Sequence, residues 1–475
     1  MTHRPELHVT LSEGILDAPA GALFDGYSWH LFNQYRPNAE SGCRWAHQVS
    51  HGNPFSFEIC DDVLAPEGDE ISLRAGSVTA VGEDVTLYYT SVSDNGRCIR
   101  IAHIPEITLT TETIGEEEFC LDIHVEKLDE TVGDCEGFDR FRSPCVVPNL
   151  NKEGWLMLAV TGSADNPTLV MLESDDGRKW NFLGPLMLTG DAGLTDSPLV
   201  APRIVRLKDE VDGEIYDVLI VTIEHKGIDV SGYLVGRLEG TTFEVLAPFN
   251  RIDHGHDFTR PRNTNRPSSA IDMATRFDEA YLFGLMNGVG RMDRAEHHHS
   301  FSCEGWANCL SLPRRVSLQN RRLYQTPFPG ILAAIEESDE ASMWTGIFEV
   351  PEGESLTAEL IDSTGQVSCT ITHYGDRLEL DRSMNAHHHG DAVAIAPLGE
   401  GDTDAVTVIA DGSTVEVFAD GGQVALASRV YFNGICEEFR IEHTDGVTVE
   451  RSTVIEPTGR ISRLIHELED EGVVR

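Results

Sequence analysis

Strand-like patterning dominates the chain from about residue 20 to residue 315. Segments such as SWHLFNQY, VTLYYTSV, GWLMLAVTG and YDVLIVTIEH are apolar or alternate apolar with polar residues, and helical spacing is hard to find there. The segments fall into five clusters, each about the size of a four-stranded blade. The clusters cover residues 22–60, 73–125, 141–185, 202–248 and 268–313. This pattern predicts a five-bladed β-propeller.

A second tract of strand-like alternation follows the turn-rich segment LYQTPFPGILAAIEESDE, residues 323–340. Alternations such as T-V-E-V-F are typical of half-buried strands and predict an antiparallel β-sandwich. Ile461, Leu464, Ile465 and Leu468 then recur at helical intervals, which predicts a short amphipathic helix. The predicted all-β chain comprises a propeller (1–325), a linker (326–340), a sandwich (341–456) and a C-terminal helix (457–475).

Acidic residues greatly outnumber basic residues over the whole chain. The 79 Asp and Glu against 36 Lys and Arg give a formal net charge of −43. Such a charge repels nucleic acid and anionic membranes. The acidic side chains also repel one another unless salt screens their charges. Because the acids are spread along the chain, we interpret them as adaptation to high salt rather than as an acidic binding surface.

Other compositional features predict a cytoplasmic protein. No run of about 18 apolar residues is present, and the start MTHRPELHVTLSEG has no apolar core of a signal peptide. The ten cysteines form no C-x-x-C, so we expect free thiols in the core. Two triple-histidine runs, 297–299 and 387–389, lack helical metal-site spacing and are interpreted as solvated loops. We expect neither a metal nor a cofactor.

The stretch GILDAPAG, residues 14–21, has the composition of a turn that leads into the first strand-like segment. A carboxylate, a proline and a glycine lie within the five residues 17–21. A turn before a buried strand is a common place for a catalytic side chain. The centre of this one is Ala18, whose methyl group can do no chemistry.

Six motifs follow one another along residues 14–435. They are WHLFNQYRP (29–37), WAHQVS (45–50), FRSP (141–144), GHDF (255–258), GWANCLSLPRRV (305–316) and DGSTVEVFADGG (411–422). In this order the motifs resemble those of the β-fructosidases of glycoside hydrolase family 32, which include invertases, levanases and inulinases. The resemblance implies a five-bladed propeller followed by a β-sandwich, as the strand pattern does.

The resemblance also implies three carboxylates: a nucleophile, an acid/base and a third that holds sugar hydroxyls. The family's W-M-N-D-P-N-G aligns with GILDAPAG, which puts Ala18 at the nucleophile and Asp17 at the preceding asparagine. The third carboxylate falls on Ser143. Within TDSPLVAPRIVRL the acid/base falls on Val200, which matches more neighbours, or on Asp196, which better matches the family's interval; we favour Val200.

Alanine and valine can neither transfer a proton nor form a glycosyl ester. We therefore expect a non-hydrolytic relative that binds a saccharide, such as a fructoside, or a partner protein. One alternative is an active β-fructosidase that uses Asp17 and Asp196 in repositioned roles on sucrose or fructans. Neighbouring side chains of an extended backbone point to opposite faces, which argues against Asp17 as a direct substitute. Another alternative is a structural subunit, in a homo-oligomer or paired with an intact homologue.

Several retained residues are candidates for substrate binding. Blade aromatics are as often core residues as sugar platforms, and polar side chains can equally bond neighbouring blades, so both interpretations stay open. The candidates are Gln34, Trp45, Ser77, Arg142, Ser143 and Trp306.

Overall fold

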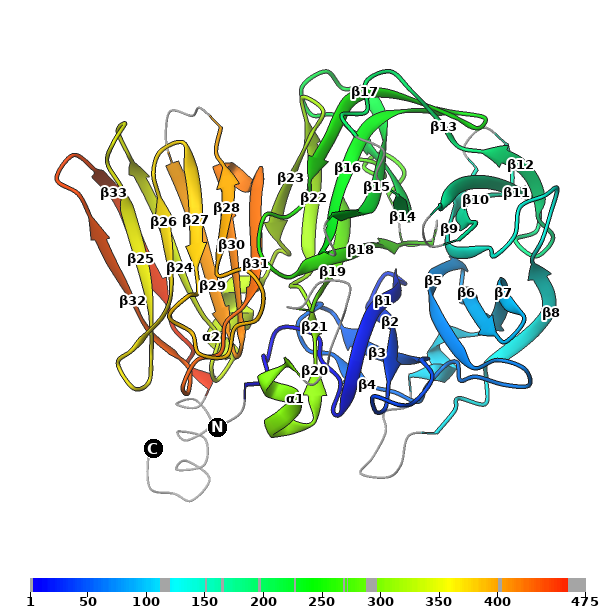
Figure 1. The fold of residues 1–475 in the computed structure, drawn as a ribbon, viewed down its shortest axis with the longest axis horizontal. Helices are drawn as coiled ribbons and strands as arrows, with labels where there is room; N and C mark the ends of the chain where they lie inside the picture. The colour runs from blue at the N-terminus through cyan, green and yellow to red at the C-terminus, as the bar shows by residue number, and fades with distance from the viewer. Residues whose placement is uncertain are drawn as a thin grey trace.

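The computed structural model places a ring of β-blades beside a two-sheet sandwich (Figure 1). It describes residues 3–459 except 112–119, 150–151, 164–165, 195–197, 226–227, 268–269, 271, 288–296 and 400–403. The predicted all-β fold, a five-bladed propeller followed by a C-terminal β-sandwich, is confirmed. The predicted C-terminal helix lies outside the described residues. No described helix is long and apolar enough to cross a membrane.

The blades follow the chain in order. Blade 1 contains β1 (Gly14–Phe24), β2 (Ser28–Arg36), β3 (Arg44–His51) and β4 (Glu58–Ile59). Blade 2 contains β5 (Ser72–Val81), β6 (Asp84–Ser93), β7 (Gly96–Ile104) and β8 (Glu126–Val132), with the 3₁₀ turn η1 (Ile107–Thr110) before β8. Blade 3 contains β9 (Arg142–Pro148), β10 (Trp155–Thr161), β11 (Thr168–Ser174) and β12 (Asn181–Pro185).

Blade 4 contains β13 (Met187–Thr189), β14 (Leu199–Lys208), β15 (Ile215–His225), β16 (Ile228–Glu239) and β17 (Thr242–Arg251). Blade 5 contains β18 (Phe258–Asn265), β19 (Ala280–Met286), β22 (Arg314–Gln319) and β23 (Arg322–Pro327). The helix α1 (His299–Glu304) and the short strands β20 (Trp306–Ala307) and β21 (Cys309–Leu310) lie between β19 and β22.

The ring closes through the innermost strands of its first and last blades. β1 pairs in parallel with β18, with Ala22 opposite Thr264 and Leu23 opposite Asn265. β20 adds to the start of β1, opposite Gly14. Blades 1 and 5 therefore share one hydrogen-bonded sheet, which leaves neither with an unpaired edge at this junction.

The sandwich stacks two five-stranded antiparallel sheets over an apolar core that includes Trp344, Phe348 and Leu360. One sheet is β31-β30-β29-β24-β33 and the other β28-β27-β26-β25-β32. The strands are β24 (Ser342–Glu349), β25 (Leu356–Asp362), β26 (Val367–His373), β27 (Arg377–Asp381), β28 (Val393–Pro397), β29 (Asp404–Asp411), β30 (Thr414–Ala419), β31 (Val424–Arg429), β32 (Cys436–His443) and β33 (Thr448–Ile455). The 3₁₀ turn η4 (Asp420–Gly422) precedes β31, and the helix α2 (Ile331–Glu337) lies in the connector before β24.

Buried ion pairs join the two domains. Glu416 of β30 accepts hydrogen bonds from the Arg314 guanidinium (Nη2–Oε2, 2.6 Å) and from the backbone N–H of Leu312 (2.6 Å). Arg314 also reaches Asp253 (Nη2–Oδ2, 2.8 Å). A buried charge that loses its partner is strongly destabilising. These pairs therefore favour one arrangement of the propeller against the sandwich.

The GHDF motif belongs to the same interface. A Cβ on Gly255 would lie 2.3 Å from the backbone nitrogen of Ala427, so only glycine allows this close approach. Asp257 accepts hydrogen bonds from Arg382 (Nη1–Oδ2, 2.8 Å) and from the backbone N–H of Arg429 (2.6 Å). Motifs that identify the family in sequence therefore hold the domains together in the structure.

Three sequence expectations are wrong in detail. Residues 14–21 form most of strand β1 rather than a turn; Pro19 is tolerated there because it lies in a bulged part of the strand. The fifth blade begins at Phe258 and includes strands after residue 313, because TRPRNTN in β18 is too polar to show strand patterning. The cysteines are free, but Cys120 and Cys303 are exposed rather than in the core.

Candidate functional site

The innermost strands of all five described blades carry a bulge near their beginning. The pairing register shifts at this point in β1, β5, β9, β14 and β18. In four of these strands the bulge contains an X-Pro dipeptide, and a proline lacks the N–H that the bulge would leave unpaired. The dipeptides are Ala18–Pro19, Ser143–Pro144, Ala201–Pro202 and Arg260–Pro261. The repeated bulges place the family's catalytic positions at one end of the ring.

Three of these bulged residues adopt a left-handed backbone. The φ angles are 55° at Ser143, 49° at Ala201 and 48° at Arg260. Residues with a Cβ adopt this region at a cost of roughly 1–2 kcal/mol. The same backbone conformation therefore recurs on three blades, although the side chains at the three positions differ.

Ala18, at the nucleophile position, is buried in apolar surroundings. It is 3% exposed and belongs to the cluster between blades 1 and 2 with Phe32, Trp45 and Leu73. Its partner across the strand pair is the buried Gln34 of β2. The position therefore serves packing in this chain.

Asp17 is a buried carboxylate whose two oxygens are both engaged. Arg36 donates to it twice, with Nη2–Oδ1 2.8 Å and Nε–Oδ2 2.9 Å. The Cys43 thiol donates to Oδ2 as well (3.1 Å), and Arg260 donates to the backbone carbonyl of Asp17 (3.3 Å). The bidentate pair orients the carboxylate toward β2.

Ser143 and Arg142 both take part in bonds within the propeller. The Ser143 backbone N–H donates to Thr90 Oγ1 (2.9 Å), which joins blade 3 to blade 2. Arg142 donates to the carbonyls of Gly162 (2.6 Å) and Ser163 (3.3 Å) at the turn after β10. The backbone of Ser143 and the side chain of Arg142 therefore take part in holding blade 3 together and to blade 2, and their contact with a sugar stays a prediction.

Val200 lies at the start of β14, immediately before the bulge, and is half-buried. In β14 the sequence Val200–Ala201–Pro202 takes the place that Arg142–Ser143–Pro144 takes in β9. The alignment of the acid/base on Val200 stays a prediction. The alternative, Asp196, lies outside the described residues.

The polar candidates Gln34 and Ser77 link neighbouring blades. The Gln34 carbonyl accepts from the backbone N–H of Ala75 (2.7 Å), and Ser77 Oγ accepts from that of Val146 (3.1 Å). Each bond satisfies a buried polar group across a blade boundary. Their contact with a sugar stays a prediction.

Trp45 and Trp306 are fully buried, each 0% exposed. The Trp45 indole donates to the carbonyl of Arg74 (3.2 Å), and the Trp306 indole to Glu304 (Nε1–Oε2, 2.8 Å). The guanidinium of Arg429 lies 5.2 Å from the Trp306 ring centroid. In this structure both rings pack in the interior, where the core interpretation of blade aromatics places them.

The sequence analysis missed two buried arginines next to the bulges. Arg203 donates to the carbonyls of Gly76 (2.7 Å) and Pro144 (2.9 Å), so it ties blade 4 to blades 2 and 3. Arg262 donates to the carbonyl of Pro261 (3.1 Å). Within the described chain neither has a carboxylate partner. A repeated Pro-Arg dipeptide at 202–203 and 261–262 was the available signal.

The positive charges at this end of the ring influence one another. Burial, together with the charges of Arg203 and Arg260, lowers the pKa of Arg262 well below its ordinary value. Retaining glycoside hydrolysis needs two carboxyl groups about 5–5.5 Å apart. The described side chains at the aligned positions, Ala18, Ser143 and Val200, provide neither.

The two histidine runs, interpreted as separate solvated loops, contact each other. His299 stacks on His387 with ring centroids 3.7 Å apart, and His297 lies 5.2 Å from His389. Burial lowers the pKa of His387, and the neighbouring His299 lowers it further. Among the described residues no group of three His, Cys, Asp or Glu side chains is arranged to hold a metal ion.

A five-bladed propeller with a candidate site at the starts of its inner strands, followed by a β-sandwich, defines a class of glycoside hydrolase fold. A model of the family "Glycosyl hydrolases family 32 N-terminal domain" matches residues 8–327, and one of "Glycosyl hydrolases family 32 C terminal" matches residues 348–456. The chain belongs to glycosyl hydrolase family 32. The resemblance drawn from six motifs is confirmed, and the replacement of the catalytic carboxylates stays a prediction.

Relatives in this family span nearly the whole chain. The sucrose-6-phosphate hydrolase of Bacillus subtilis (strain 168) is 25% identical over 465 residues, which cover 90% of this chain and 89% of that protein. The raffinose invertase of Escherichia coli is 23% identical over 468 residues, with 90% of each chain covered.

Solved structures agree with the fold. The exo-inulinase of Aspergillus awamori superposes with a TM-score of 0.76 at 17% identity, covering 96% of this chain and 98% of that one. The sucrose-6-phosphate hydrolase of Lactobacillus gasseri gives a TM-score of 0.73 at 18% identity, with 95% and 92% covered. At these identities the superpositions show a common fold alone.

Proposed function

We propose that this chain is a carbohydrate-metabolism protein of family 32 that binds a fructoside without hydrolysing it by the family's two-carboxylate mechanism. The observation that carries the proposal is the surroundings of Ala18, a methyl group within an apolar cluster. Ser143 and Val200 at the other two aligned positions add to it, because neither side chain can serve as a carboxylic acid.

Hydrolysis and binding are measured side by side to test this function. Sucrose and inulin are incubated with the full chain in molar KCl, and fructose release is followed; the same sugars are titrated calorimetrically. We expect fructose release at the rate of the buffer alone and a saturable heat with at least one fructoside. Turnover that disappears in Asp17→Asn but persists in Asp94→Asn, an exposed control, would overturn the proposal.

An active β-fructosidase with repositioned carboxylates is the second candidate. Its support is the burial of Asp17, 7% exposed, one residue from the nucleophile position. For Asp17 to attack a sugar, its oxygens would have to leave Arg36 and Cys43. Turnover that rises in Arg36→Gln would favour this candidate.

We also propose where and in what form the protein works. The net charge of −43 supports a cytoplasm rich in salt. In place of a saccharide, the altered site could accept a partner protein, an intact homologue or a second copy. Light scattering after gel filtration in molar KCl, with and without a catalytically intact family member, distinguishes these assemblies from a monomer.

A further inference from the structure

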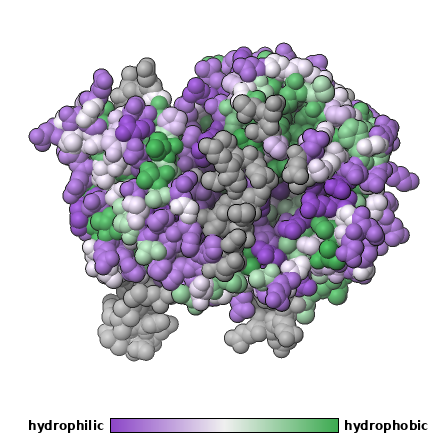
Figure 2. All heavy atoms as spheres, in the orientation of Figure 1, coloured by the Kyte–Doolittle hydropathy of each residue, from purple (hydrophilic) through white to green (hydrophobic). Residues whose placement is uncertain are grey.

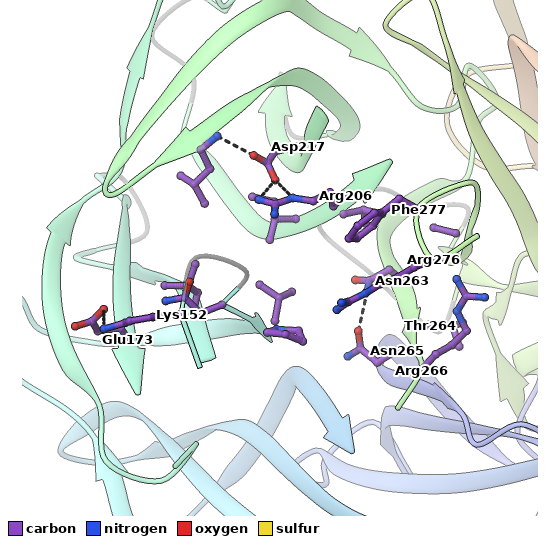
Figure 3. A pocket seen from close by; sticks show the side chains of 18 of the residues that line it. Lys152, Glu173, Arg206, Asp217, Asn263, Thr264, Asn265, Arg266, Arg276 and Phe277 are labelled. Carbon is purple, nitrogen blue, oxygen red and sulfur yellow. Dashed lines mark hydrogen bonds and ion pairs between the residues drawn. The ribbon is translucent and has the colours of Figure 1, made fainter. Parts of the chain in front are cut away.

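A cavity opens in the propeller at a distance from the aligned catalytic positions, farther along the inner strands. Its volume is about 380 Å³, and blades 3, 4 and 5 line it (Figure 3). On β9 it begins at Val147, four residues beyond Ser143. At about 3.3 Å per strand residue, the cavity lies about 13 Å from that bulge, toward the other end of the strands.

Two of the cations in the wall are neutralised by neighbouring carboxylates. Lys152 pairs with Glu173 (Nζ–Oε2, 2.7 Å), and Arg206 pairs with Asp217 (Nη2–Oδ1, 2.8 Å). Figure 3 shows both pairs within the wall of the cavity. Their charges are satisfied before any ligand arrives.

Two further guanidinium groups have no carboxylate partner within the described residues. Arg276 covers the ring of Phe277 at 5.1 Å from its centroid. Arg266 covers Tyr281 at 5.5 Å and donates to the backbone carbonyl of Glu279 (3.3 Å). The wall also carries Glu279, whose carboxylate accepts from the Tyr281 hydroxyl and lies 3.9 Å from Arg315 Nε (to Oε2), a residue outside the wall. The four cations of the wall, Lys152, Arg206, Arg266 and Arg276, therefore outnumber its carboxylates, Glu173, Asp217 and Glu279, in a chain of net charge −43.

Polar groups suited to hydroxyls lie between these arginines and the strands. Asn263 donates to Asn265 (Nδ2–Oδ1, 3.0 Å), which orients its amide at the wall. The side chains of Asn263 and Asn265 therefore share one face of β18.

We propose that this cavity binds a phosphorylated monosaccharide, with Arg266 and Arg276 on the phosphate and Asn263 on the sugar. Guanidinium groups bind phosphate oxygens in a bidentate manner. Carboxamide and hydroxyl groups bind sugar hydroxyls. The volume lies within the ~300–1,000 Å³ typical of small-molecule sites. This site is separate from the one proposed for a fructoside.

Calorimetric titration with fructose 6-phosphate, fructose and inorganic phosphate tests the proposal. The full chain is used at the lowest KCl concentration that keeps it folded, because salt weakens binding of anions. We expect fructose 6-phosphate to bind at least tenfold more tightly than either fructose or inorganic phosphate. Equal binding of inorganic phosphate would overturn the sugar contact, and equal binding of fructose would overturn the phosphate contact.

Substitutions locate the binding on the molecule. Arg276→Ala and Arg266→Ala should each weaken fructose 6-phosphate binding at least tenfold, and Arg276→Lys should weaken it less. Arg178→Ala, an exposed arginine elsewhere on blade 3, is the matched control. Thermal unfolding confirms that each variant folds. Unchanged affinity in both alanine variants, or no binding to the parent chain, would overturn the proposal.

Discussion

Asp17, the unpaired residue of a bulge in β1, is joined to Arg36 at the end of β2 by two hydrogen bonds of 2.8 and 2.9 Å. The one carboxylate of β1 is thereby turned toward the neighbouring strand. The pair explains how an acid one residue from the nucleophile position can be retained without performing the family's chemistry. If the role of Asp17 is structural, its substitution should lower the stability of the fold. If its role were catalytic, the same substitution would lower activity.

We expect Asp17→Ala to destabilise the fold by about 2–3 kcal/mol and to leave sugar hydrolysis unchanged. The loss comes from the two charge-assisted hydrogen bonds that the partly buried Arg36 donates to the Asp17 carboxylate. Urea unfolding in molar KCl measures it, with Asp94→Ala as the exposed control. Equal stability of the two variants would contradict this account of the pair.

Glu416→Gln should destabilise the chain by roughly 3–5 kcal/mol and loosen the contact between the domains. The variant leaves Arg314 without one of its two buried carboxylate partners. Differential scanning calorimetry should resolve two transitions where the parent shows one. The exposed Glu442→Gln is the control. A single unshifted transition in Glu416→Gln would contradict the prediction.

Stability should fall as the pH rises through about 9, because of His8. Burial alone would lower its pKa, but Asp411 and Glu416 raise the pKa to about 9. Its stabilising contribution is complete below the unfolded value of about 6.5, and is lost as the proton leaves the folded chain. Urea midpoints across this pH range measure the slope, which His8→Gln should remove and His103→Gln should retain.

On the acid side, two partly buried histidines should make the fold less stable as the pH drops from about 6.5 to about 4. Burial, with the Arg251 charge beside His254 and the Arg382 charge beside His256, lowers both pKa values to about 4. The unfolded chain takes up these protons first, so stability present above pH 6.5 is lost in this interval. The difference in urea midpoint between parent and His256→Gln checks the prediction; His443→Gln, at an exposed site, should follow the parent.

Salt should raise the melting temperature steeply. Hydrophilic residues extend over both domains on the face seen in Figure 2, and the chain carries a net charge of −43. The Debye length falls from about 10 Å at 0.1 M to about 3 Å at 1 M, which screens this repulsion. Melting curves in KCl and in equally concentrated sorbitol test it. A sorbitol effect as large as that of KCl would speak against charge screening.

The architecture could be predicted from the sequence because each buried strand has a recognisable local pattern of apolar residues. The apolar run in YDVLIVTIEH is strand β15, in which every residue from Tyr216 to Thr222 is buried. The polar strand β18 escaped prediction because its pairing with β1 closes the ring, and such pairing depends on residues more than 200 positions apart. No local pattern carries that information.

The assignment of the candidate site to Ala18, Ser143 and Val200 comes from the motif order and stays a prediction. The bulges were not predicted: Ala18 and Ser143 lie at bulges, and Val200 lies immediately before one. The partners of Asp17 and the burial of Trp306 depend on strand register and on domain docking. Three-dimensional neighbours of this kind decide whether a retained residue binds a sugar or supports the fold.

The hydrogen bonds between Asp411 and residues 6–8 constrain the order in which the protein folds during its synthesis. The backbone N–H groups of Glu6, Leu7 and His8 all donate to the Asp411 carboxylate, across more than 400 positions. A chain that leaves the ribosome from its N-terminus holds these groups in water until the sandwich emerges. The blades can assemble during synthesis, but residues 6–8 reach their final place only after Asp411 has been made.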